Sequence, residues 1–445
     1  MTKILKNTQT LINASILAGT FSTIALSTTS AHAVELNIAT VNNGHMIEMQ
    51  KLSNEFETLH PDIQLKWHVY NEGSLRMRAI ADIASGGGRY DVLTIGMYEA
   101  PIWAKHGWLK PLNFSASYDV DDLLPSVREG LSYEGELYAA PFYGESSMLM
   151  YREDLLSKAN LSFSSRPSWD QVYNAAQKMH DPENDIYGIC LRGKPGWGDN
   201  MALISTMVNS FGGQWFDMNW TPQIDSPAWQ KAVSFYIDLL SNYGPPNSEK
   251  NSFNEILSLS REGKCAMWID ASVAASFITN QDESQYANNW KFAQSPYQET
   301  RLGANWLWAW SLAIPQNTKK LEAAETFISW ATSKDYIGLI AKNNGWKNIP
   351  TGTRTSTYQE QNFLSVAGVF ANAELEALRT ATPDNSTLPA SPYSGIQFVP
   401  IPEFVPIAGN TGQKIAEVLE GNMSVQEALS SAQKTAVREM KRAEH

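Results

Sequence analysis

Three tryptophans occupy alternate positions of the stretch "NWLWAWSLAIP", residues 305–315. Side chains at i, i+2 and i+4 of a β-strand share one face, so Trp306, Trp308 and Trp310 are expected on the same side. That face is either part of the core or an aromatic platform for a ligand. Strands of a sheet covered by helices are buried on both faces, so the pattern alone leaves both interpretations open.

Glu145 and Asp270 are two carboxylates that could act together in acid–base chemistry. A glycosidase uses two carboxyl groups about 5–10 Å apart, a distance that the sequence does not fix. We find no nucleophile elbow and no metalloprotease motif. The glycine-rich "LRGKPGWGDN" lacks the phosphate-binding pattern, and the acidic "DPENDIYG" lacks the spacing of a calcium loop. We expect no catalytic residue, no metal and no cofactor, and keep an exported glycosidase as a remote alternative.

The beginning of the chain indicates export. Lys3 and Lys6 precede an interrupted apolar stretch that ends in Ala31-His32-Ala33, which is typical of a cleaved secretory signal over residues 1–33. Its removal would change the net charge from −12 to −14, because two lysines and no acids are lost. A chain this acidic is not expected to bind nucleic acid.

Cys190 and Cys265 are the only cysteines. In an exported protein such a pair can form a disulfide, and two separately buried thiols are the alternative. We leave both interpretations open. No cluster of histidines or cysteines at ligand spacing supports a metal site.

The elements that must position these residues alternate between strand and helix. Strand patterns cover 35–42, 62–70 and 90–96, with helical spacing over 44–59 and 74–88 between them. This order predicts an α/β fold with mostly parallel sheets flanked by helices, and ligands of such sheets sit beyond the carboxyl ends of the strands. Later, "YGICLRG" and "CAMWID" are predicted strands. Ser168, Ser226 and Ser424 are predicted helix caps.

Several stretches occur in the order and spacing typical of one family. "HPDIQLKWHVYNEG", "YDVLTIGMYEAPIWAKHGWLKPL", "GELYAAPFYGESSMLMYREDL" and "GKCAMWIDASVAA" resemble the ABC-transporter extracellular solute-binding proteins of the maltose-binding-like family. "NWLWAWSLAIP", "GTRTSTY" and "PYSGIQFVPIPEF" are similar to its mannitol- and sorbitol-binding branch. The resemblance covers essentially the whole mature chain.

This resemblance implies a periplasmic binding protein fold of two lobes, joined by a hinge with three crossings. Lobe one is expected over 34–143 and 301–346, and lobe two over 144–300 and 347–445. It further implies a periplasmic monomer that binds a sugar alcohol between the lobes and delivers it to the membrane permease subunits of an ABC importer. A binding protein for a disaccharide or an oligosaccharide is the alternative.

A sugar alcohol needs hydrogen-bonding groups for its hydroxyls and aromatic faces for its C–H groups. The resemblance places such contacts in loops at strand ends, at Glu145 beside the first crossing, and at the two tryptophans nearest the second crossing; Trp310 is left in the core. Asn43, Asp199 and Asp270 have helix capping as an alternative role. The predicted ligand-binding residues are Asn43, His45, Tyr98, Glu99, Glu145, Arg192, Trp197, Asp270, Trp306 and Trp308.

Overall fold

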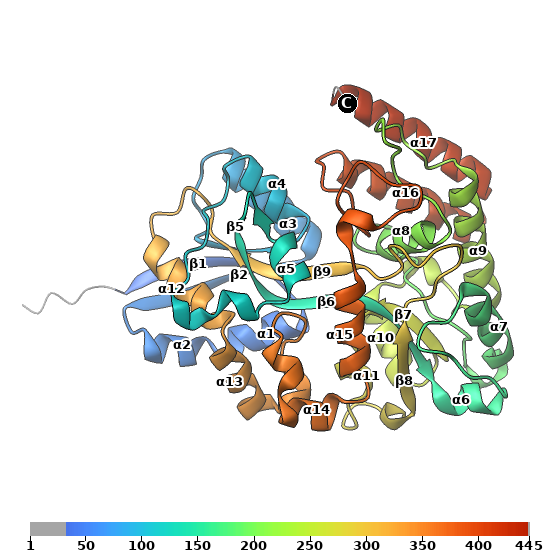
Figure 1. The fold of residues 1–445 in the computed structure, drawn as a ribbon, viewed down its shortest axis with the longest axis horizontal. Helices are drawn as coiled ribbons and strands as arrows, with labels where there is room; N and C mark the ends of the chain where they lie inside the picture. The colour runs from blue at the N-terminus through green and yellow to red at the C-terminus, as the bar shows by residue number, and fades with distance from the viewer. Residues whose placement is uncertain (1–32, 444–445) are drawn as a thin grey trace, which may run out of the picture.

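The computed structural model describes residues 33–443. The predicted signal peptide, residues 1–33, therefore lies outside the described residues except for its last position. Within 33–443, no helix is long and apolar enough to cross a membrane. Figure 1 shows two lobes side by side, joined by extended segments near the middle of the molecule.

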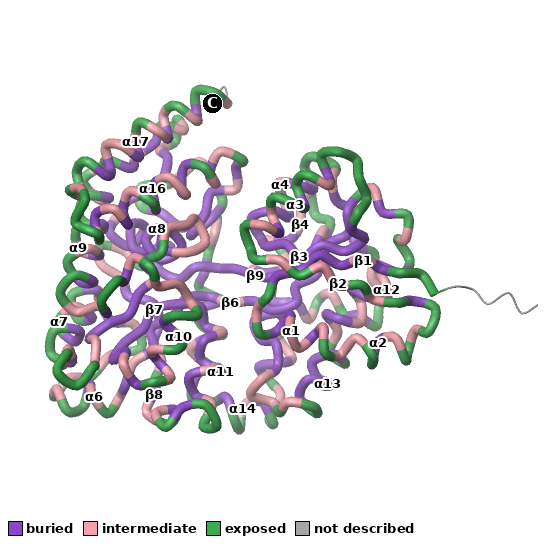
Figure 2. The backbone as a smooth tube through the Cα atoms, turned by 180° about the vertical axis from the view of Figure 1, so that it is seen from behind, coloured by how far each residue is buried: buried purple, intermediate pink, exposed green. Residues whose placement is uncertain are grey.

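The first lobe is built around strands β1, β2 and β3. Helices α3 and α4 cover one side of these strands, and α1, α2, α12 and α13 lie on the other (Figures 1 and 2). Its elements are β1 (Val34–Val41), α1 (Gly44–Lys51), α2 (Ser53–Leu59), β2 (Ile63–Tyr70), α3 (Glu72–Ala84), β3 (Val92–Gly96), α4 (Glu99–Lys105), α5 (Pro125–Gly130), β4 (Ser132–Tyr133), β5 (Glu136–Leu137), α12 (Leu321–Ala331) and α13 (Lys334–Asn344).

The second lobe is mainly helical, with a small sheet at its centre. Helices α8, α9, α16 and α17 pack on one another, and α17 ends the described chain at one edge of the molecule (Figure 1). The elements outside the first lobe are β6 (Ala139–Arg152), α6 (Glu153–Lys158), α7 (Trp169–Met179), α8 (Asn200–Ser210), α9 (Pro227–Tyr243), α10 (Phe253–Arg261), β7 (Met267–Ala271), α11 (Ala274–Ile278), β8 (Trp290–Gln294), β9 (Leu307–Ala313), α14 (Gln361–Ala367), α15 (Ala371–Thr380), α16 (Phe404–Leu419) and α17 (Val425–Arg442).

One sheet runs through both lobes in the order β2-β1-β3-β9-β6-β7, with β8 also paired to β6. The predicted two-lobed α/β fold is confirmed. The predicted parallel pairing holds for β1 with β2 and β3, but it is wrong for the second lobe, where β7 and β8 both run antiparallel to β6. A helix between two strands permits a parallel crossover but does not require one, so the alternation of elements misled the prediction.

Strand β6 forms the first connection between the lobes. Its first half pairs with β9 and its second half with β7 and β8, and both crossing strands lie at the buried centre of the molecule (Figure 2). The carbonyl of Thr351 accepts the N–H of Gly144 at 2.8 Å, which places the predicted third crossing against β6. A Cβ atom on Gly144 would lie 2.2 Å from the carbonyl oxygen of Gly352, so glycine permits this close approach. The exact lobe boundaries stay a prediction.

Helix starts follow the predicted caps in part. Ser168 and Ser424 form complete capping boxes. Ser226 is the N-cap of α9 with proline next to it, but its side chain makes no capping hydrogen bond. The single predicted helix over 44–59 is divided into α1 and α2 at Leu52.

A disulfide joins Cys190 and Cys265, whose Cα atoms are 5.7 Å apart. The predicted strand over 187–193 is wrong, since this segment makes only isolated bridges, one of them a parallel bridge between Cys190 and Trp268. That bridge sets residues two positions further along, Arg192 and Asp270, beside each other. Local pairing and the disulfide together position the start of the glycine-rich loop.

Candidate ligand-binding site

A cavity of about 1060 Å³ lies between the lobes and is lined from both of them. Its first-lobe wall comes from the loops that follow β1 and β2, and its second-lobe wall from the loop before α8, from α10 and from the segment after β7. The hydrogen-bonding and aromatic side chains that line it are Asn42, Asn43, His45, Tyr70, Asn71, Glu72, Tyr143, Glu145, Arg192, Lys194, Trp197, Asp199, Ser252, Phe253, Asn254, Arg261, Phe277, Trp306, Trp308, Trp310 and Gln397.

The crossing strands β6 and β9 supply the wall that joins the two lobes. Tyr143 pairs with Trp310, and Glu145 with Trp308, and directly opposed residues of an antiparallel pair lie on the same face. The register shifts between Pro141 and Tyr143. Without this bulge Glu145 would oppose Leu307, on the other face of β9. The bulge therefore turns the carboxylate toward the tryptophans, a role typical of bulges near functional sites.

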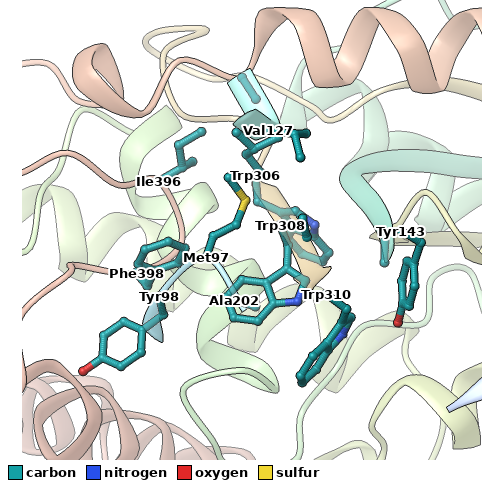
Figure 3. Close-up of a cluster of buried hydrophobic side chains, with 14 of the residues drawn as sticks. Met97, Tyr98, Val127, Tyr143, Ala202, Trp306, Trp308, Trp310, Ile396 and Phe398 are labelled. Carbon is teal, nitrogen blue, oxygen red and sulfur yellow. The ribbon is translucent and has the colours of Figure 1, made fainter. Parts of the chain in front are cut away.

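The three tryptophans are both buried and part of the cavity wall. Trp306, Trp308 and Trp310 are 3, 7 and 8% exposed, yet all three line the cavity. Trp310 is in the core as expected, and because it shares the face of Trp308 it also lines the cavity. Figure 3 shows Tyr98 and Phe398 on one side of these indoles and Tyr143 on the other.

The ring of Trp308 packs closely against the first lobe. It lies 5.6 to 5.9 Å from the rings of Trp310, Trp197 and Phe398. A Cβ atom on Gly96 would approach its indole to 2.0 Å. The indole of Trp306 differs, because its buried N–H has no hydrogen-bond partner among residues 33–443. A buried donor without a partner costs free energy, and this one belongs to a side chain that lines the cavity.

Glu145 is one of only two residues of β6 that are not fully buried. Its carboxyl group makes no hydrogen bond or ion pair that the structure records between residues 33 and 443. Burial raises the pKa of this carboxyl to about 8, against the opposing field of Arg192. At neutral pH the group is therefore largely protonated. It is a hydrogen-bonding group without a protein partner, directed at the cavity.

Arg192 is held rigidly in the second-lobe wall. Its Nε and Nη2 donate to the two oxygens of Asp270 at 2.8 and 2.5 Å, and its Nη1 donates to the carbonyl of Gly198 at 2.8 Å. Burial alone would lower the pKa of Arg192, but the field and hydrogen bonds of Asp270 outweigh it, and the pKa is raised. The charge of this guanidinium is therefore balanced within the protein.

Asp270 does not line the cavity. It is 0% exposed, and besides Arg192 it accepts hydrogen bonds from the indole of Trp268 and the N–H of Ala271. Its placement does not favour the predicted direct contact with a ligand and indicates a positioning role for Asp270.

Asn43 and His45 both line the cavity at the start of α1. Asn43 caps the helix by accepting the N–H of Met46 at 3.1 Å, and its Nδ2 donates to the hydroxyl of Tyr143 at 2.9 Å. The capping role considered for Asn43 is thus present. Burial lowers the pKa of His45 to about 4, so the imidazole is neutral at neutral pH.

Tyr98 and Glu99 lie behind the cavity wall. The hydroxyl of Tyr98 donates to the carbonyl of Ile401 at 2.8 Å, and the carboxylate of Glu99 accepts hydrogen bonds from the guanidinium of Arg76 and the N–H of Gly96. With these groups engaged, their placement does not favour direct ligand contact.

Trp197 connects this region to the second lobe. Its ring lies 5.2 Å from that of Tyr98 and 4.5 Å from the guanidinium carbon of Arg76. Trp197 also lines the cavity, so one side chain serves both the ligand site and the contact between the lobes.

The sequence analysis missed Glu72, Tyr143 and Arg76. Glu72 lines the cavity and pairs with Arg76, and the guanidinium of Arg76 lies within 6 Å of the rings of Trp197, Trp308 and Trp310. Tyr143 could have been found from its spacing, because it stands two residues before Glu145 and shares its face. No local pattern marks Arg76.

Comparisons with known proteins agree with this architecture. Residues 43–337 match the family model described as bacterial extracellular solute-binding protein. A mannitol-binding protein of Pseudomonas aeruginosa is 49% identical, over 94% of this chain and 96% of its own length. A crystal structure of an ABC transporter solute-binding protein from Agrobacterium vitis with bound D-mannitol has a TM-score of 0.90 at 51% identity, covering 92% of this chain and 99% of that one.

A solute-binding protein from Agrobacterium radiobacter in complex with ribitol shares the fold, with a TM-score of 0.79 at 24% identity over 91% of this chain and 98% of that one. The family resemblance inferred from the sequence is confirmed. The chain belongs to the bacterial extracellular solute-binding proteins.

Proposed function

We propose that this protein is the substrate-binding component of an ABC importer and that it binds a neutral sugar alcohol of the mannitol or sorbitol type in the cavity between its lobes. The observation that carries the proposal is that polar groups without hydrogen-bond partners lie next to aromatic side chains in the cavity wall. The carboxyl group of Glu145 and the indole N–H of Trp306 have no partner that the structure records within 33–443, and tryptophans surround them. Hydroxyls can satisfy the polar groups while C–H groups pack on the rings.

The relatives support the choice of ligand. A mannitol-binding protein is 49% identical over nearly the full length, and a structure at 51% identity contains D-mannitol. Individual residues of the cavity wall distinguish between similar sugars. High identity to proteins that are named for mannitol or were solved with it therefore supports an alditol as the ligand more strongly than the alternative, a disaccharide or an oligosaccharide.

The geometry does not favour the glycosidase alternative. That mechanism needs two carboxyl groups on either side of a glycosidic bond. Asp270 is fully buried and bound at both oxygens by Arg192, so it cannot serve as the second carboxyl group. We propose binding without turnover.

Calorimetric titration with D-mannitol, sorbitol, ribitol, maltose and maltotriose tests the function. Protein that has been unfolded and refolded to remove any bound ligand should bind mannitol or sorbitol at least about tenfold more tightly than the maltosaccharides. Mass spectrometry of the recovered ligand should find it intact. Tighter binding of maltose would favour the disaccharide alternative, and a hydrolysis product would indicate an enzyme.

The cellular part of the proposal is delivery from the periplasm to a membrane permease. It is supported by the family and by the predicted signal over residues 1–33. Deleting the protein should abolish mannitol uptake at low external concentration, and cell fractionation should place the mature chain in the periplasm. Unchanged uptake in a strain without a redundant receptor would contradict this role.

A further inference from the structure

The cavity contains an acid without a counter-ion of its own. The side chain of Glu145 emerges from the buried crossing strand β6 and meets no hydrogen-bond donor that the structure records within residues 33–443. The other buried carboxylates near it are engaged: Asp270 with Arg192, and Glu374 with three hydroxyl groups. Glu145 is therefore a carboxyl group of the cavity wall that is left for a ligand, whereas Asp199 in the same wall accepts a hydrogen bond from Ser252 and Glu72 pairs with Arg76.

The charged groups around Glu145 favour a cation beside it. Three carboxylates, Asp270, Glu72 and Glu374, act on Glu145 with the same sign, and Arg192 acts against them. The charge of Arg192 is already shared with Asp270 through two hydrogen bonds. Glu72 is likewise paired with Arg76, so these ion pairs are balanced and leave the carboxyl of Glu145 as a group with which a cation can pair.

Other groups of the wall do not supply the missing cation. His45 is neutral at neutral pH, because burial lowers its pKa to about 4. Arg261 pairs with Glu283, and Lys194 is exposed in the wall and makes no ion pair with Glu145 that the structure records within 33–443. The phenol of Tyr143 adds no charge, since burial raises its pKa well above the ordinary value.

The walls next to Glu145 are aromatic. Trp308 lies directly across from it on β9, and Trp306 and Tyr143 line the same cavity. An ammonium group is attracted to the face of such rings. The free N–H of Trp306 can donate to a hydroxyl oxygen, so a polar chain attached to the ammonium group also finds a partner.

We propose that the cavity also binds amino-alditols, which are sugar alcohols with one terminal hydroxyl replaced by a protonated amine, and that the ammonium group is bound by Glu145. A primary ammonium is close in size to a hydroxyl and offers three donors, and its bond to a carboxylate is charge-assisted. The inference rests on the proposed alditol-binding function and extends it from neutral to cationic ligands. The ionised form of Glu145 repels an aldonate, which carries a carboxylate at the chain end, so the affinity for an aldonate should fall as the pH rises through the pKa of Glu145.

The pH dependence follows from the state of Glu145. Its pKa is about 8, and a bound ammonium group favours the ionised form, so binding near neutral pH releases a proton. The affinity for an amino-alditol should therefore rise from pH 6 to about pH 8. It should fall again where the amine loses its own proton, near the ordinary pKa of about 10 for an alkyl ammonium group.

Calorimetric titration at pH 8 with glucamine, its neutral parent sorbitol and the anion gluconate tests the inference. Glucamine should bind at least as tightly as sorbitol, and the affinity for gluconate should fall as the pH is raised from 6 to 9, opposite to the rise expected for glucamine between pH 6 and 8. Glu145→Gln should weaken glucamine at least about tenfold more than it weakens sorbitol. The matched control Glu183→Gln, at an exposed loop outside the cavity, should change neither. Titration of the unaltered protein in two buffers of different ionisation enthalpy should show proton release with glucamine at pH 7.

The outcomes separate this inference from the proposed function. Binding of sorbitol or mannitol with glucamine at least 100-fold weaker would overturn the inference and leave the proposed function intact. Equal loss of both ligands in Glu145→Gln, together with no proton release in the unaltered protein, would also overturn it. Binding of glucamine without any neutral alditol would support the site on Glu145 and contradict the proposed function. If no alditol of any charge bound, both would be wrong.

Discussion

Glu145 in the cavity and Glu374 near the hinge are both acids that burial makes harder to ionise, but their surroundings differ. Glu374 is 0% exposed and accepts hydrogen bonds from Ser272 at 2.8 Å, Thr351 at 3.0 Å and Tyr358 at 2.8 Å. Burial raises the pKa of both carboxyls. For Glu374 three hydroxyl donors oppose that rise, whereas Glu145 has no donor that the structure records among residues 33–443.

This difference separates a group that stabilises the fold from one that serves a ligand. Ser272 follows β7, Thr351 lies at the third crossing beside Gly144, and Tyr358 lies further along the chain, so Glu374 ties distant segments together. A buried polar group that is left without a partner costs free energy. At Glu145 a bound ligand can supply the missing hydrogen bonds, so the free energy that the unpaired carboxyl group costs is recovered on binding.

The largest effect is expected for Glu374→Ala. The change removes three hydrogen bonds and leaves the hydroxyls of Ser272, Thr351 and Tyr358 without an acceptor. At about 1 to 1.5 kcal/mol each, we expect the free energy of unfolding to fall by about 4 kcal/mol in urea titrations. Glu374→Gln, which keeps the shape and one acceptor oxygen, should lose less than half as much. A loss below about 1 kcal/mol for Glu374→Ala would show that this cluster does not stabilise the hinge.

Trp308→Ala should affect stability and binding together. Its ring fills the space above Gly96 and contacts Trp197, Trp310 and Phe398, so its removal leaves a cavity and should cost about 3 kcal/mol or more. The same ring lines the ligand cavity, and affinity for mannitol should also fall. Thermal melts and calorimetric titrations of this variant and of Trp308→Phe measure both effects. Normal affinity with a lowered melting temperature would place Trp308 in the core only.

The alternation of Trp306, Trp308 and Trp310 was enough to predict a shared face, and the family resemblance was enough to place Glu145 at a crossing. The sequence could not decide whether that face was core or cavity wall, because the structure makes it both. The deciding feature is the bulge after Pro141, which moves Glu145 onto the face of the tryptophans. An extra residue in β6 does not change the alternation of residue types in β9, so the pattern of β9 could not predict the bulge.

The roles of Arg192 and Asp270 show a second limit. Each residue stands at the end of a segment where ligand contacts are common, and both were predicted as contacts for that reason. They are 78 positions apart, and the bridge between Cys190 and Trp268 brings them together. Their mutual ion pair then buries Asp270 behind the wall. A polar side chain that its local sequence predicts to contact a ligand can instead be bound by a residue that is distant in sequence.

Glu145→Ala should weaken mannitol binding by roughly twofold to tenfold for each hydrogen bond lost, since the carboxyl is largely protonated at neutral pH and a hydrogen bond between neutral groups contributes about 0.5–1.5 kcal/mol. Calorimetric titration measures the change, with Glu183→Ala as the control at an exposed carboxylate. In contrast to Glu374→Ala, this variant should not lose stability, because no protein hydrogen bond is removed. Unchanged affinity would remove Glu145 from the ligand site, and a large loss of stability would give it a structural role like that of Glu374.

The remaining effect, which solvent in the cavity reduces most, is the pH dependence of stability that Glu145 contributes. Its pKa is about 8 in the folded chain and about 4.3 for an ordinary glutamate, so between these values the folded state holds a proton that the unfolded state has released. The unaltered protein should therefore lose stability from this group as the pH rises from about 4.3 to about 8, with a slope of at most about 1.4 kcal/mol per pH unit. Solvent at the cavity surface will reduce that slope.

Glu145→Gln has no carboxyl group to ionise, so it does not lose this stability as the pH rises. The variant and the unaltered protein should therefore have similar free energies of unfolding at pH 4.5, and the variant should become progressively more stable than the unaltered protein up to pH 8. Urea titrations of ligand-free protein across this range, with Glu183→Gln as control, measure the difference. A difference that does not vary with pH would mean that the carboxyl of Glu145 is solvated in the folded state, and the contrast with Glu374 would then rest on hydrogen bonding alone.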